Sequence, residues 1–126
     1  MPIEYAYDEK ANVLYTRFFG VVTDDDLRNQ ARAVAEDGRV RPEVRELVDL
    51  SEIEKVEASP DTFDDIIVVE RAHGQKFLGM RTAIFAPTDL LYGYSRMFQS
   101  MADLREAPST VKTFRTLQEA RDWLGL

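Results

Sequence analysis

The chain has 126 residues, enough for one domain over residues 1–126 with a hydrophobic core, and its 44% apolar and 31% charged composition excludes a disordered chain. The absence of cysteine excludes disulfides, a thiol nucleophile and cysteine-bound zinc, and no apolar run approaches the roughly 18 residues of a membrane span. With 16 basic and 23 acidic residues the net charge is −7, so we expect a cytoplasmic domain that neither spans a membrane nor binds nucleic acid.

A β-hairpin is predicted at the start of the chain. Apolar and polar residues alternate over residues 3–7, as in a strand with one buried face, and Val13 to Phe19 is rich in aromatic and β-branched residues. A helix is predicted next, because Thr23 is a good N-cap residue and Asp26 stands at the reciprocal position of a capping box. This helix should end near Gly38.

The middle of the chain contains two predicted strands with a helix between them. Residues 46–50 form a short strand, and Ser59 followed by Pro60 predicts the start of a helix, since proline suits the first helical position. Residues 66–69 would suit a strand by propensity, but the cap and the surrounding acidic residues favour a helix. Residues 82–86 are almost continuously apolar, which predicts a strand buried on both faces.

The last part of the chain adds a helix, a strand and a final helix. Thr88 caps a helix that runs to about Asp103, residues 111–114 form a strand, and Thr116 caps a helix through Leu124. The order of elements is therefore ββαβαβαβα. Strands separated by helices require right-handed crossovers and parallel neighbours, whereas the hairpin supplies an antiparallel strand. The sequence predicts an α/β domain with a mixed five-stranded sheet.

The negative charge is concentrated in one segment. Residues 46–70 contain nine acidic residues and a single base, Lys55. One interpretation is a solvated acidic face that aids solubility. The other is a docking surface for a basic protein partner, since complementary charge speeds encounter. The candidate partner surface consists of Glu52, Glu54, Glu57, Asp61 and Asp65.

Few residues suggest catalysis, and we expect no enzymatic activity. Glu70 and His73 are three residues apart on a predicted helix, so they could touch and act as a general acid–base pair. The alternative is a histidine at the edge of the core with a local hydrogen bond. Residues 24–26 are consecutive acids of one helix, and their side chains point about 100° apart, too divergent for a metal ion. No phosphate loop or metal cluster is present, so no cofactor is expected.

The helix over residues 88–103 is unusually rich in apolar side chains. Leu90, Met97 and Leu104 belong to an arc wider than a helix needs to cover a sheet, and we interpret the arc mainly as core. Tyr92 falls on the opposite side of the helix with Arg96. Because aromatic residues are common interface anchors, we predict a homodimer whose contact includes Tyr92 and Arg96 or the adjoining flank of the helix.

The order of elements, the size and three segments are similar to those of a known family. Residues 2–5, 20–23 and 46–50 resemble SpoIIAA-like proteins, bacterial cytoplasmic relatives of the STAS domain whose fold is also compared with the lipid-binding SEC14 type. The resemblance implies a non-catalytic regulatory module that binds a protein partner through the acidic surface. The alternative is a carrier of a small apolar or lipid ligand in a crevice beneath the second and third helices. The side chains expected to line that crevice are Phe63, Ile66, Met97 and Met101.

Ser59, at the predicted start of the second helix, is either a helix N-cap or a phosphorylation site. In STAS antagonists a serine at this helix N-terminus is phosphorylated by the partner kinase, and Ser59 lies one position beyond the matching residue, Ala58. A phosphate would be opposed here by Glu57 and Asp61, and Pro60 removes one N–H donor. We therefore interpret Ser59 as an N-cap, with phosphorylation as the alternative.

Overall fold

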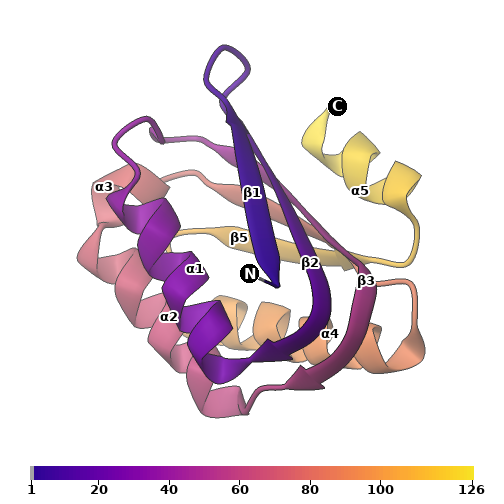
Figure 1. Cartoon of the computed structure of the whole chain (residues 1–126). Helices are drawn as coiled ribbons and strands as arrows, with labels where there is room; N and C mark the ends of the chain where they lie inside the picture. Colours follow the sequence, from indigo (N-terminus) through magenta and orange to yellow (C-terminus); the bar gives the residue numbers. More distant parts are fainter. Residues whose placement is uncertain (1) are drawn as a thin grey trace.

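The order of the strands in the sheet follows their order in the chain. The computed structural model, which describes residues 2–126, contains one five-stranded sheet in the order β1-β2-β3-β4-β5 (Figure 1). β1 pairs antiparallel with β2 as the predicted hairpin, and the other neighbours are parallel. The strands are β1 (Ile3–Asp8), β2 (Val13–Thr23), β3 (Arg45–Glu57), β4 (Arg81–Phe85) and β5 (Thr110–Phe114).

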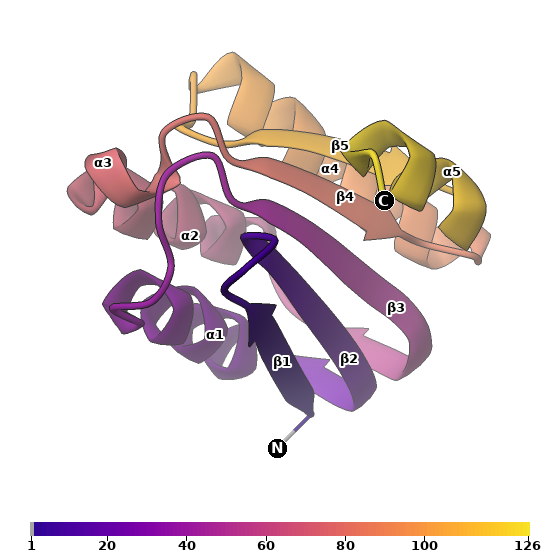
Figure 2. The same ribbon diagram turned by 90° about the horizontal axis from the view of Figure 1, so that it is seen from above.

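This strand order sends the crossover helices to one face of the sheet. Each right-handed crossover steps to the next strand in the same direction, so α1, α2 and α4 cover the same face, whereas α5 follows the last strand and covers the other (Figure 1, Figure 2). The predicted order ββαβαβαβα is confirmed, with one short helix, α3, added before β4. The helices are α1 (Asp24–Glu36), α2 (Pro60–Ala72), α3 (Gly74–Phe77), α4 (Asp89–Leu104) and α5 (Leu117–Leu124).

β2 and β3 continue beyond the rest of the sheet as a bent two-stranded ribbon. The register shifts after Arg17 and again after Gly20, and at each shift β3 contains an extra residue. Such bulges bend and twist a strand pair. Gly20 has a φ of +65°, a backbone conformation that glycine adopts without strain. The ribbon therefore curves past the end of the three-strand region formed by β3, β4 and β5 (Figure 1).

The hydrophobic core is divided by the sheet. Val48 and Ile84 point toward α2 and α4, and Leu47 and Ala83, their neighbours along the strands, pack against α5. This alternation follows from the two-residue period of a strand. No helix over residues 2–126 has the length and apolar character that a membrane crossing requires.

Candidate functional site

A cavity of about 170 Å³ lies between the sheet and the layer formed by α1, α2 and α4. The sheet side of the cavity comes from the same faces of β2, β3 and β4 that carry the apolar core. Most of its lining side chains are apolar. Polar side chains gather at the N-terminal ends of the parallel strands, and they include two carboxyl groups, Glu46 and Glu70.

Glu46 lies on the cavity face of β3. The hydroxyl group of Thr16 in β2 donates to Oε2 of Glu46 at 2.6 Å, and that of Thr82 in β4 lies 3.4 Å from Oε1. Burial raises the pKa of Glu46, and the two hydroxyl hydrogen bonds oppose that rise. Glu46, one of the nine acidic residues counted in the segment 46–70, thus lines the cavity instead of contributing only to the acidic exterior.

Glu70 reaches the same cavity from α2. Only 8% of its surface is exposed, and the hydroxyl group of Ser109, just before β5, donates to its Oε1. Burial raises the pKa of Glu70 to about 7, opposed by the bond from Ser109 and reinforced by the nearby charge of Glu46. The cavity therefore has a polar end with two carboxyl groups and three hydroxyl groups.

The other end of the cavity is apolar and is formed in part by the β2–β3 ribbon. Ile53 and Val56 of the ribbon line it from one side. Phe63 of α2 and Phe98 of α4 line it from the other, with their ring centroids 5.4 Å apart. A bound molecule would thus meet carboxyl groups at one end and aromatic and aliphatic side chains at the other.

The crevice residues expected from the sequence are only partly those of the cavity. Phe63 and Ile66 line it, as expected. Met97 does not: its side chain is on the outer side of α4 and is 43% exposed. Met101 packs against the core cluster of Val48 instead of lining the cavity.

The structure does not bring Glu70 and His73 together. Glu70 points into the cavity toward Ser109, whereas the exposed ring of His73 lies with Nδ1 3.0 Å from the backbone oxygen of Val69. His73 is the C-cap residue of α2, where the helix ends and the side chain turns outward. The acid–base pair is therefore wrong, and the local hydrogen bond suggested as its alternative is present. Among residues 2–126, no group of three or more candidate ligands is placed to hold a metal ion.

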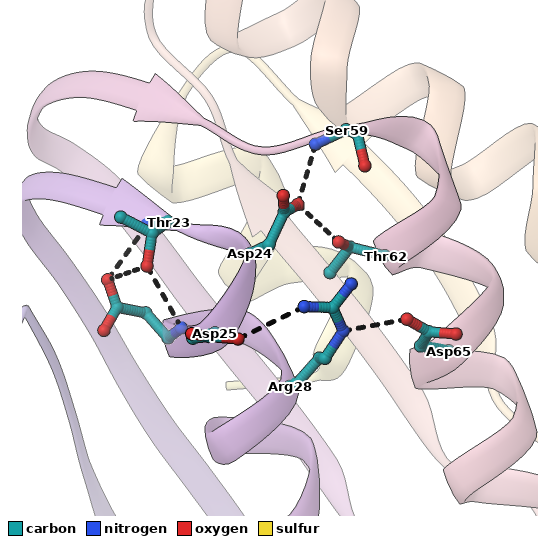
Figure 3. A network of polar contacts seen from close by, with 8 residues as sticks. Thr23, Asp24, Asp25, Arg28, Ser59, Thr62 and Asp65 are labelled. Carbon is teal, nitrogen blue, oxygen red and sulfur yellow. Dashed lines mark hydrogen bonds and ion pairs between the residues drawn. The ribbon is translucent and has the colours of Figure 1, made fainter.

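Ser59 occupies the N-cap position of α2, but its hydroxyl group makes no capping hydrogen bond. Asp24, in the first turn of α1, instead binds the start of α2 across the helix pair (Figure 3). Its Oδ1 accepts from the backbone N–H of Ser59 at 2.8 Å and from the hydroxyl group of Thr62. These bonds, first from Thr62 and then from Ser59, hold the pKa of Asp24 below its usual value.

This network predicts different effects for two alanine substitutions. Ser59→Ala should change stability by no more than about 0.5 kcal/mol, because the backbone N–H still reaches Asp24. Asp24→Ala should lower the Tm by several degrees, because the buried Thr62 hydroxyl and the Ser59 N–H both lose their acceptor. Thermal unfolding followed by circular dichroism measures both. Equal losses in the two variants would contradict the conclusion that Asp24, and not the Ser59 hydroxyl group, holds the start of α2.

The residues of the candidate partner surface are exposed but largely paired. Glu52 lies 3.2 Å from Arg17, and Asp65 lies 2.8 Å from Arg28. Glu57 lies 3.0 Å from Lys55. Among the described residues, Glu54 and Asp61 have no ion-pair partner, and they are the acids of this surface whose charge is least compensated.

Tyr92 of α4 does not point away from the core, although the sequence predicted that it would. Tyr92 is half-buried against the core, with the guanidinium of Arg96 6.0 Å and that of Arg115 5.3 Å from its ring. The exposed apolar side chains are Leu90 at 66% and Leu104 at 83%, with Met97 between them. The apolar arc is wider than the contact with the sheet, so one flank of it remains in solvent.

Comparisons with known proteins show what the chain as a whole is similar to. A family model described as SpoIIAA-like matches residues 13–125. One similar crystal structure is that of an uncharacterized protein from Shewanella loihica PV-4, which belongs to the DUF3478 family and has a SpoIIAA-like fold. The two sequences are 23% identical, the match covers 97% of this chain and 93% of that protein, and the TM-score is 0.59. The unphosphorylated anti-sigma factor antagonist SpoIIAA is 11% identical over 98% of this chain and 97% of its own, with a TM-score of 0.50. None of the curated proteins compared with the chain matches it.

Proposed function

The chain belongs to the SpoIIAA-like family, and we propose that it is a binding protein that holds a small apolar molecule in the cavity between its sheet and helices α1, α2 and α4. The observation that carries the proposal is the cavity itself. Protein interiors are close-packed, so a space of this size that side chains leave unfilled is available to a ligand. An apolar cavity of about 150 Å³ is known to stay dry and to accept benzene, so one of about 170 Å³ suits an aromatic ring with one substituent.

The volume of the cavity favours one of the two ligand classes, small apolar molecules and lipids, that the resemblance to SEC14-type folds suggested. Known ligand pockets for drug-sized molecules measure about 300–1,000 Å³, and a two-chain lipid needs more. A cavity of about 170 Å³ supports a small apolar molecule instead of a lipid. Glu70 faces Ser109 while His73 lies at the surface, an arrangement that supports binding over acid–base catalysis by these two residues.

The proposal predicts that filling the cavity abolishes ligand binding. Ser95 of α4 is buried and lines the cavity, so Ser95→Leu should occupy part of the space. Toluene should bind to the unchanged protein in the millimolar range and lose at least tenfold in affinity to Ser95→Leu. Ligand-observed NMR and calorimetric titration measure the affinity of both proteins for toluene.

Ser100→Leu is the matched control, because Ser100 is an exposed position of the same helix. It should bind toluene as the unchanged protein does, and the melting curves of both variants report whether they fold. Failure of toluene to bind to the unchanged protein at its solubility limit would overturn the proposal.

A second candidate function is binding of a protein partner through the acidic surface. It is supported by Glu54 on the β2–β3 ribbon and Asp61 at the start of α2, which have no ion-pair partner among the described residues, and by the similarity of the fold to an anti-sigma factor antagonist. A partner would carry a basic surface. Charge reversal at Glu54 and Asp61 should weaken capture of such a partner, whereas Ser95→Leu should not.

Self-association through α4 is compatible with either function. Leu90, Met97 and Leu104 follow each other at seven-residue intervals on the exposed side of the helix, which is the spacing of a helix-pairing seam. Tyr92 and Arg96 lie on the adjoining flank. The homodimer stays a prediction that sedimentation of the unchanged protein and of Leu104→Glu would test.

A further inference from the structure

The polar end of the cavity contains acidic groups without a base. Glu46 and Glu70 come from opposite walls, β3 and α2, and none of the described residues that line the cavity is a lysine, arginine or histidine. Buried carboxylates in proteins are ordinarily paired with a cation, because an isolated buried charge is costly. The cavity therefore offers two carboxyl groups whose usual counterpart is missing from its walls.

The hydroxyl groups at this end of the cavity do not take the place of a cationic partner for the two carboxyl groups. Thr16 and Thr82 use both oxygens of Glu46, but Ser109 reaches only Oε1 of Glu70. Oε2 of Glu70 accepts no hydrogen bond from a described residue, and the side chain lines the cavity. Hydrogen bonds from a charged donor are roughly twice as strong as those from a neutral one, so this oxygen favours a cationic donor.

We propose, building on the function proposed above, that the molecule held in the cavity is a small primary amine with an apolar body. Its ammonium group lies at Glu46 and Glu70, and its apolar body extends toward Phe63 and Phe98. An ammonium group has three donors and one positive charge, which match the open oxygen of Glu70 and the acidic pair. The charge of Glu46 also acts on Glu70, so both carboxyl groups are within electrostatic reach of one bound cation.

The test uses four molecules of one shape at pH 8. Toluene has the apolar body alone, and benzyl alcohol adds a neutral polar group to it. Benzylamine adds a positively charged group, and benzoate adds a negatively charged one. Calorimetric titration should give benzylamine an affinity at least tenfold higher than that of benzyl alcohol, with benzoate the weakest. In Glu70→Gln, and more fully in the double variant with Glu46→Gln, benzylamine should fall to the affinity of benzyl alcohol while toluene still binds.

Glu54→Gln is the control for attraction of the amine to the acidic exterior, because Glu54 is exposed on the β2–β3 ribbon. It should leave the affinity for benzylamine unchanged. If toluene, benzyl alcohol and benzylamine bind equally well, or if benzoate binds best, the amine proposal is overturned and the apolar binding function stands. If none of the four binds, the binding function itself fails.

Discussion

Replacing Glu70 by glutamine should raise the free energy of unfolding at pH 8 by about 3 kcal/mol and have little effect near pH 4.5. The pKa of Glu70 rises to about 7 because the side chain is buried, and a tenfold change in proton affinity corresponds to about 1.4 kcal/mol. Above pH 7 the folded protein holds an ionised carboxylate in the cavity with one hydroxyl donor, Ser109. Glutamine has the same shape without that charge.

The direction of the pH dependence follows from proton binding. The folded state binds the proton of Glu70 more tightly than the unfolded chain does, so its stabilising effect is complete below the unfolded pKa and is lost as the pH rises to about 7. Urea unfolding at a series of pH values should show that decline, and Glu70→Gln should remove most of it. The decline that remains in Glu70→Gln is expected to come from Glu46, whose pKa is also raised. Glu54→Gln, at an exposed position of β3, controls for the loss of one negative charge. A Glu70→Gln variant less stable at pH 8 would contradict the prediction.

Ile84→Asp should prevent stable folding. Ile84 lies in the interior strand β4, between β3 and β5, and is 6% exposed against α2 and α4. An aspartate there would replace apolar contacts by an unpaired carboxyl group beside an already acidic cavity, a loss of several kcal/mol from a total of about 5–15. Ile84→Val, which removes one methyl group, should cost about 0.5–1.5 kcal/mol. Far-ultraviolet circular dichroism and urea unfolding distinguish the variants. A soluble Ile84→Asp protein that melts cooperatively would mean that the strand is not buried as described.

The regular part of the fold could be predicted from the sequence, and the ribbon could not. Residues 3–7 alternate with a period of two, residues 13–19 are rich in aromatic and β-branched residues, and Thr23 and Thr88 cap the helices that follow β2 and β4. Beyond Leu50 the apolar residues Ile53 and Val56 recur every third residue, because the two bulges each insert a residue into β3. That spacing matches no strand template, and the acidic residues between them obscured the second half of β3.

The positions of the two carboxyl groups could be read from the sequence patterns, but both were counted with the acidic segment 46–70, and Glu70 was paired with His73. Glu46 alternates with Val48 and Leu50, which places it on the buried face of β3. Glu70 follows Phe63 by seven residues and Ile67 by three, on the buried face of α2. The cavity itself has no sequence signal, because it depends on how the volumes of side chains from several elements add up in three dimensions.

The position of α5 has a consequence for synthesis of the chain. Within residues 2–126 it is the only helix over the face of the sheet that carries Leu47 and Ala83, and its Leu124 is fully buried there. A ribosome completes all five strands and the other helices before α5 emerges. Until then the sheet can pair while one of its apolar faces is open to water. A released chain that ends just before Leu117 would thus have a sheet with one exposed apolar face, suited to recognition by chaperones and proteases.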